Sequence, residues 1–278
     1  MSEYVEIIVM WGAVTLYAAS AVLFVLGLVF RRPALITVGL WAGALGMLPH
    51  VIAIGGRWIR VGHGPYLGFY EVVSSYALMT VAALLVITKR FPALRIAGVV
   101  VMPIAFLLLG GSMLAPKAGL EITPKLASWW LTIHVAFAKL SYGAFVAAMV
   151  LGVVYLFRDR MTGRAAALAK RFPPEAAIDD LTFRFLAVGF IFLGIMIAAG
   201  AIWANEAWGR YWAWDPIETW SLISWLVYAA VLHARLTLGW RDRKFAWAAV
   251  AALPIVLFAL IGVPVVYNSI HGAYLVGY

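Results

Sequence analysis

One stretch of the chain, residues 181–203, reads LTFRFLAVGFIFLGIMIAAGAIW and contains a single charged side chain, Arg184. About 20 mostly apolar residues in a helix span the ~30 Å hydrocarbon core of a bilayer, so this stretch predicts a transmembrane helix. Seven further runs of this kind occur, at residues 5–30, 34–54, 70–88, 95–113, 130–157, 219–239 and 245–266. The alternation of apolar and polar residues that marks a membrane barrel is absent. We therefore predict an all-α integral membrane protein, a bundle of about eight transmembrane helices in a single polytopic domain over residues 1–278.

The composition excludes a soluble protein. Of the 278 residues, 65% are hydrophobic and 12% are charged, whereas soluble domains average roughly 45–50% and about 25%. The absence of cysteine excludes disulfides, thiolate metal sites, iron–sulfur clusters, cysteine nucleophiles and covalent attachment of c-type haem. The net charge of +9 comes from short basic caps between apolar runs, and a nucleic-acid partner would require a contiguous basic patch. We predict membrane lipid as the solvent and no nucleic-acid partner.

The basic residues also predict the topology. Fifteen lysines and arginines lie in one set of alternate connections and five in the opposite set. Because cytoplasmic loops carry the excess of these residues, the richer face is predicted to be cytoplasmic. Both termini are then on the outer, periplasmic or lumenal side. The first residues carry Glu3 and Glu6 rather than a cationic segment, so no signal peptide is expected.

The five histidines divide by depth. At 1.5 Å per residue, His134 lies ~7 Å below the outer end of the fifth predicted helix, and His233 lies ~21 Å from the outer end of the seventh. His271 follows the eighth helix, and His50 and His63 are near the outer surface as well. An ionisable side chain in a membrane is a candidate functional group. The alternative for each is a neutral imidazole bonded to a carbonyl or a serine, and spacing alone does not choose between them.

A tryptophan-rich loop, WANEAWGRYWAWDPIETW, occupies residues 203–220. Five of the chain's 13 tryptophans lie here, namely Trp203, Trp208, Trp212, Trp214 and Trp220. An aromatic belt at the membrane interface explains one or two rings at a helix end, but not five in one connection. If the loop forms a short interfacial helix, Trp208 and Trp212 are expected to share a face. Asp215 and Pro216 are expected either to end that helix or to start the next one, with Asp215 as the N-cap and Pro216 at the first helical position.

A shelf of flat apolar rings suits a flat apolar ligand, such as a porphyrin, a quinone ring or a carotenoid. The neighbouring histidines favour an iron porphyrin, because neutral imidazole is a common axial ligand of haem iron. Arg57, Arg60 and Arg210 lie on the same side and are expected to meet the propionates. From these residues alone, haem, a quinone and an unliganded structural belt all remain open.

The loop and the helix after it, SLISWLVYAAVLHARL at residues 221–236, resemble the "WWD" signature of haem-handling proteins in cytochrome c maturation. The match is similar to the CcsA (ResC) family rather than to the shorter, six-helix CcmC haem-delivery proteins. Residues 62–71, GHGPYLGFYE, resemble an outer segment of the same family. The resemblance implies a multi-pass protein of the bacterial plasma membrane, or of the thylakoid membrane if the gene is plastid-encoded.

The resemblance also implies roles for individual residues. His134 and His271 fall on the positions that ligate the iron of haem b at an outer site, and His233 falls on a ligand of haem within the membrane. The cofactor-binding residues of the loop would be Trp203, Trp208, Trp212, Trp214 and Asp215. The second inner ligand is expected from a CcsB (ResB) membrane subunit.

The implied function is haem transport across the membrane and its presentation and ligation to apocytochrome c. The chain would then be a subunit of a cytochrome c synthase, which forms thioether bonds between the haem vinyl groups and a Cys-x-x-Cys-His segment. One alternative is a haem exporter or chaperone of the CcmC type without ligation activity. Another is a membrane b-type cytochrome that exchanges electrons with quinone.

Overall fold

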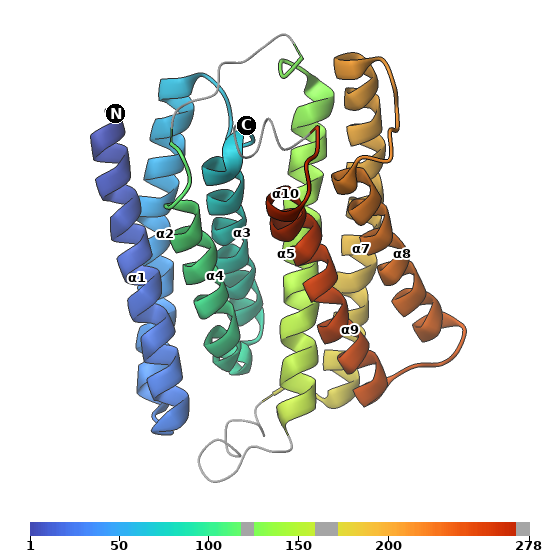
Figure 1. Cartoon of the computed structure of the whole chain (residues 1–278). Helices are drawn as coiled ribbons and strands as arrows, with labels where there is room; N and C mark the ends of the chain where they lie inside the picture. The colour runs from blue at the N-terminus through green and yellow to red at the C-terminus, as the bar shows by residue number, and fades with distance from the viewer. Residues whose placement is uncertain (118–124, 159–171, 271–278) are drawn as a thin grey trace. The chain divides into compact units, whose positions relative to one another are not determined.

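The structure is a computed structural model that describes residues 1–117, 125–158 and 172–270. Its elements are α1 (Glu3–Val29), α2 (Pro33–Val61), α3 (Gly68–Arg90), the 3-10 helix η1 (Pro92–Ala97), α4 (Gly98–Ser112), α5 (Trp129–Phe157), α7 (Glu175–Trp208), α8 (Pro216–Leu236), α9 (Asp242–Leu257), the π-helical turn η3 (Phe258–Gly262) and α10 (Val263–Val266). Across the described ranges, eight helical segments are long and apolar enough to cross a membrane, and strands are absent. The prediction of an eight-helix, all-α membrane protein is confirmed (Figure 1). Which side the termini occupy stays a prediction.

The described residues form two compact units. The first contains residues from Met1–Pro65, Tyr70–Lys117 and Val154–Ala177, and the second contains residues from Tyr66–Phe69, Ala118–Val153 and Ile178–Tyr278. The expectation of one polytopic domain over the whole chain stays a prediction.

In the first unit, α1 and α2 run antiparallel and side by side (Figure 1). Glycines spaced three and four residues apart, Gly39, Gly43 and Gly46, lie on the face of α2 that is buried. A Cβ atom on Gly46 would lie 2.7 Å from the ring of Tyr17 on α1. Small residues are common where membrane helices pack, because they allow two backbones to approach closely.

In the second unit, α5 contacts both α7 and α8 through the ring of Phe145. A Cβ atom on Gly189 of α7 would lie 2.5 Å from the ring of Phe145 on α5. The same Phe145 ring is stacked on Tyr228 of α8, with centroids 3.5 Å apart and planes 2° apart. These contacts hold α7 and α8 against the helix that carries His134.

Several helix ends differ from the prediction. The helix α2 continues to Val61 instead of ending at residue 54, and it therefore includes Arg57 and Arg60. Both arginines are paired with carboxylates. The pairing offsets the free-energy cost of burying these charges, which the hydropathy pattern had assigned to a loop. The helix α8 begins at Pro216, the position that the predicted cap gives it, and ends at Leu236 rather than at residue 239.

The expected short helix through Trp208 and Trp212 is wrong. Trp208 is the last residue of α7, and residues 209–215 are not helical. Gly209 ends α7 with a φ of +74°, a left-handed conformation that glycine adopts without steric cost. Trp208 and Trp212 therefore do not share a helix face.

Candidate functional site

His134 lies in the second turn of α5, and a backbone carbonyl holds its ring. The Nδ1 atom is 2.9 Å from the carbonyl oxygen of Met196 on α7. A carbonyl oxygen only accepts hydrogen bonds, so Nδ1 is the protonated nitrogen and Nε2 carries the lone pair. Metal-ligating histidines commonly donate their other ring N–H to a backbone carbonyl in this way. The ring is therefore in the tautomer that an axial ligand needs.

Gly200 of α7 makes room for this imidazole. A Cβ atom at Gly200 would lie 2.6 Å from Nδ1 of His134 and 2.9 Å from its Cε1. Both separations are shorter than side-chain contacts allow, so any larger residue would displace the ring. The close approach of the imidazole to α7 requires glycine at this position.

His134 opens onto a cleft of about 350 Å³, a volume that includes its open mouth. The cleft is lined by His134, Met196, Ile197, Gly200, Ala201, Tyr211, Trp212, Ile217, Glu218 and Ser221. Of the residues predicted from the sequence, the structure brings His134 and Trp212 together here. Most of the wall is apolar or aromatic. The imidazole of His134 and the carboxylate of Glu218 are its ionisable groups.

The non-helical loop before α8 is held by a capping box. Asp215 accepts a hydrogen bond from the backbone N–H of Ile217 at 3.0 Å, and Pro216 follows it at the first helical position, so both predictions are confirmed. Glu218 returns to accept from the backbone N–H groups of Ala213 at 2.8 Å and of Asp215 at 3.2 Å. These two amides flank Trp214, which has a φ of +58° and a side chain that is 69% exposed. The carboxylate of Glu218 thus stabilises a strained backbone that presents an exposed indole.

The remaining tryptophans of the loop have other surroundings. Trp203 is 3% exposed and donates its indole N–H to the carbonyl of Lys125 at 2.8 Å. Its ring lies 4.9 Å from that of Trp208, and both pack with Leu67 in an apolar cluster. Trp220 packs edge-on against Phe258 at 4.7 Å. The rings therefore divide into a buried cluster, a cleft wall and an exposed loop, and their assignment to cofactor binding stays a prediction.

His233 lies in the last turn of α8, and its side chain is exposed. Its Nδ1 is 3.4 Å from the hydroxyl of Thr237. Because α8 begins at Pro216, His233 is ~26 Å along the helix from the loop rather than ~21 Å. His271, the predicted partner of His134, lies outside the described residues.

The sequence of this chain is similar to those of known proteins. The sequence pattern of the family described as "Cytochrome C assembly protein" matches residues 66–271. The chain belongs to the cytochrome C assembly protein family. The matched range contains the tryptophan loop and His134, His233 and His271.

Individual relatives are similar to this chain along most of its length. "Cytochrome c biogenesis protein CcsA" of Gloeobacter violaceus is 30% identical over 91% of each chain. The protein of the same description from Guillardia theta is 32% identical, again over 91% of each chain. Among solved structures, "Cytochrome c Heme Lyase CcmF" superposes with a TM-score of 0.66 at 18% identity. The superposition covers 93% of this chain and 48% of that one, so this chain spans about half the length of that structure and shares its fold.

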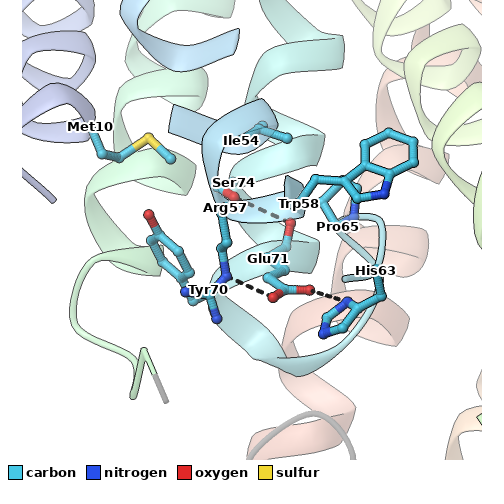
Figure 2. Close-up of a pocket in the computed structure, with 9 residues that line it drawn as sticks. All are labelled: Met10, Ile54, Arg57, Trp58, His63, Pro65, Tyr70, Glu71 and Ser74. Atoms are coloured by element: carbon cyan, nitrogen blue, oxygen red, sulfur yellow. Dashed lines mark hydrogen bonds and ion pairs between the residues drawn. The ribbon is translucent and has the colours of Figure 1, made fainter. Parts of the chain in front are cut away.

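A cluster of paired charges in the first unit was not predicted from the sequence. Arg57, 5% exposed, donates from Nε to Glu71 at 2.7 Å and from Nη1 to Glu6 at 3.3 Å. Arg60 also pairs with Glu6, at 2.5 Å. Figure 2 shows the carboxylate of Glu71 between Arg57 and His63, whose Nδ1 is 3.6 Å away. The two arginines, expected to meet propionates, are instead bound to the protein's own carboxylates.

Helix polarity explains this cluster. Glu6 and Glu71 lie near the N-termini of α1 and α3, where a helix dipole favours negative charge. Arg57 and Arg60 lie near the C-terminus of α2, where it favours positive charge. The sequence therefore contains one indication of this cluster, the position of each charge relative to a helix end. That indication can be used only once α2 is known to continue to Val61.

The two other histidines of the predicted outer group are buried within the first unit. His50 has its Nδ1 3.1 Å from the hydroxyl of Tyr17, and His63 has its Nδ1 2.8 Å from the carbonyl of Gly64. His63 is thus bonded to a neighbouring carbonyl, as the alternative expected, whereas the neighbour of His50 is a tyrosine hydroxyl rather than a carbonyl or a serine.

Proposed function

We propose that this protein presents haem b, its substrate, at the cleft beside the tryptophan loop for attachment to apocytochrome c. The observation that carries the proposal is the setting of His134. The Met196 carbonyl holds the ring with Nε2 as the lone-pair nitrogen, and Gly200 provides the space for it. Membership in the cytochrome C assembly family supports haem as the ligand over a quinone or an unliganded belt.

In the proposed outer site, His134 and His271 are the axial ligands of the haem iron. Trp212 supports one face of the ring, and the exposed Trp214 lies at the mouth of the site. An apocytochrome segment brings two thiols to the vinyl edge, where each S–H adds across a vinyl C=C. One carbon then gains the sulfur and the other gains the proton. The contribution of this chain is positioning, which makes the bond-forming step effectively intramolecular.

The inner end of the proposed path is His233. Its side chain is exposed at the last turn of α8, so a ligand on the surface of this chain could reach it. A second imidazole from a membrane subunit of the CcsB type would complete the coordination of haem there. Transfer from His233 to His134 then carries haem from the cytoplasmic half of the membrane to the outer face. The proposed location is the bacterial plasma membrane, or the thylakoid membrane for a plastid-encoded chain.

The test is haem binding and attachment by the chain purified with its membrane partner. We expect a Soret band from the intact complex supplied with haemin, and we expect His134→Ala to lose the outer haem. Adding an apocytochrome with a reductant should yield covalent haem stain on a denaturing gel. A colourless complex would refute the proposal. Haem transfer without covalent product would favour the exporter alternative of the CcmC type.

A further inference from the structure

The two carboxylate oxygens of Asp215 accept hydrogen bonds from two separate parts of the chain. Its Oδ1 accepts from the backbone N–H of Ile217 at 3.0 Å and so caps α8. Its Oδ2 accepts from the backbone N–H of Ile270 at 2.8 Å, across 55 residues of chain. Asp215 is 6% exposed, so both bonds are shielded from water.

Capping alone does not require a carboxylate. An N-cap needs one acceptor oxygen, and Asn or Ser serves about as well as Asp at that position. The second oxygen of Asp215 therefore serves another purpose, and its bond to Ile270 is of the stronger, charge-assisted kind. That bond joins the segment after α10, which ends at Val266, to the start of α8.

The place where the segment is held matters for the cleft. Ile217 and Glu218, the second and third residues of α8, line the cleft together with His134. Ile270 is bonded to the cap of that same helix, and it immediately precedes His271 in the sequence. Ile270 is therefore bonded to the start of the helix whose second and third residues line the cleft with His134.

We infer that Asp215 is a positioning residue for the outer ligand His271, and that it acts through the backbone amide of Ile270 rather than by touching haem. This inference rests on the proposed function, because it presupposes that His134 and His271 share one iron. It also separates Asp215 from the tryptophans, which would contact the porphyrin directly.

The test uses Asp215→Asn in the complex with the membrane partner. Asparagine keeps one carbonyl oxygen for Ile217, but its NH2 group cannot accept from Ile270. Without haem, hydrogen exchange at the Ile270 amide should become about tenfold faster, while the amides of the first turn of α8 stay protected. With haemin, the outer haem should change from low spin to high spin and bind about 10- to 100-fold more weakly. Added imidazole should restore the low-spin spectrum.

Two further variants make the outcomes decisive. Asp215→Ser keeps the cap with a hydroxyl and lacks the second oxygen, so it should repeat the effects and replaces Asp215→Asn if that protein does not fold. Asp180→Asn removes the same charge from an exposed residue that pairs with Arg184 and should leave both readouts unchanged.

Unchanged exchange at Ile270, or a low-spin outer haem in Asp215→Asn, would overturn the inference while leaving the proposed function intact. A wild-type complex that binds no haem would instead refute the proposed function. In that case the exchange measurement alone still decides whether Asp215 anchors Ile270.

Discussion

Replacing Gly200 by alanine should weaken haem binding without unfolding the protein. The new Cβ atom would lie 2.6 Å from Nδ1 of His134, whereas ordinary contact begins at 3.4 Å, so the imidazole must move by about 0.8 Å away from α7. Met196 is also on α7, and the same movement stretches the 2.9 Å hydrogen bond beyond 3.5 Å. The loss of such a supporting bond typically lowers metal affinity about 10- to 100-fold, or ~1.4–2.7 kcal/mol.

The effect on stability should be small. Alanine is favoured over glycine inside a helix by about 1 kcal/mol, and overpacking costs about 1–3 kcal/mol. The two contributions oppose each other, so the free energy of unfolding should change by less than about 2 kcal/mol. A loss of haem binding without unfolding would therefore show that the position of the His134 imidazole against α7 determines the affinity for haem.

The assay is a haemin titration of the purified complex, followed at the Soret band, together with thermal unfolding. Gly143→Ala is the matched control, because Gly143 lies within α5 and its Cβ would meet nothing within 4 Å. In a His134→Ala background, Gly200→Ala should have no further effect, since the ring it displaces is gone. If Gly200→Ala binds haemin as tightly as the wild type, the argument that His134 is an axial ligand held by α7 fails.

Three other substitutions test separate parts of the molecule. His233→Ala should deplete haem at both sites if transit is sequential, and full outer-site haem in that variant would contradict the sequence of steps. Arg57→Leu removes the cation shared by two buried carboxylates. It should lower the free energy of unfolding by about 3–5 kcal/mol in a thermal or denaturant titration. The control, Arg184→Leu, removes one partner of an exposed pair and should lower the free energy of unfolding by less than about 1 kcal/mol. Arg235→Lys loses the guanidinium contact to Asp179, at 2.5 Å in a site 5–6% exposed, and should cost about 1–3 kcal/mol by the same measurement. An unchanged midpoint would show that an ammonium group pairs with Asp179 as well as a guanidinium does.

The cluster around Arg57 could not be predicted from the sequence. Hydropathy placed Arg57 and Arg60 in an outer loop, because two arginines after Gly55 and Gly56 read as the end of a span. The helix continues because its charges are matched by Glu6 from α1, more than 50 residues away. No local pattern contains that information.

The tryptophan loop gave a mixed result for a similar reason. The cap at Asp215 and Pro216 depends on three neighbouring residues, and it was predicted correctly. The fate of each ring depends on what packs against it: Trp203 is buried by Leu67 and Leu126, which come from distant segments of the chain. A count of tryptophans could therefore indicate a ring-binding loop, but it could not tell a cleft wall from a core residue.

The sequence by itself determined the solvent, the number of spans, the helix cap and the inventory of imidazoles and indoles, because these follow from composition and from residues close together in the chain. Only the tertiary structure decided the tautomer of His134, the need for glycine at 200 and the bond from Asp215 to Ile270. Each of these joins groups separated by 55 to 66 positions, and such contacts arise only when helices pack at distances of a few ångströms.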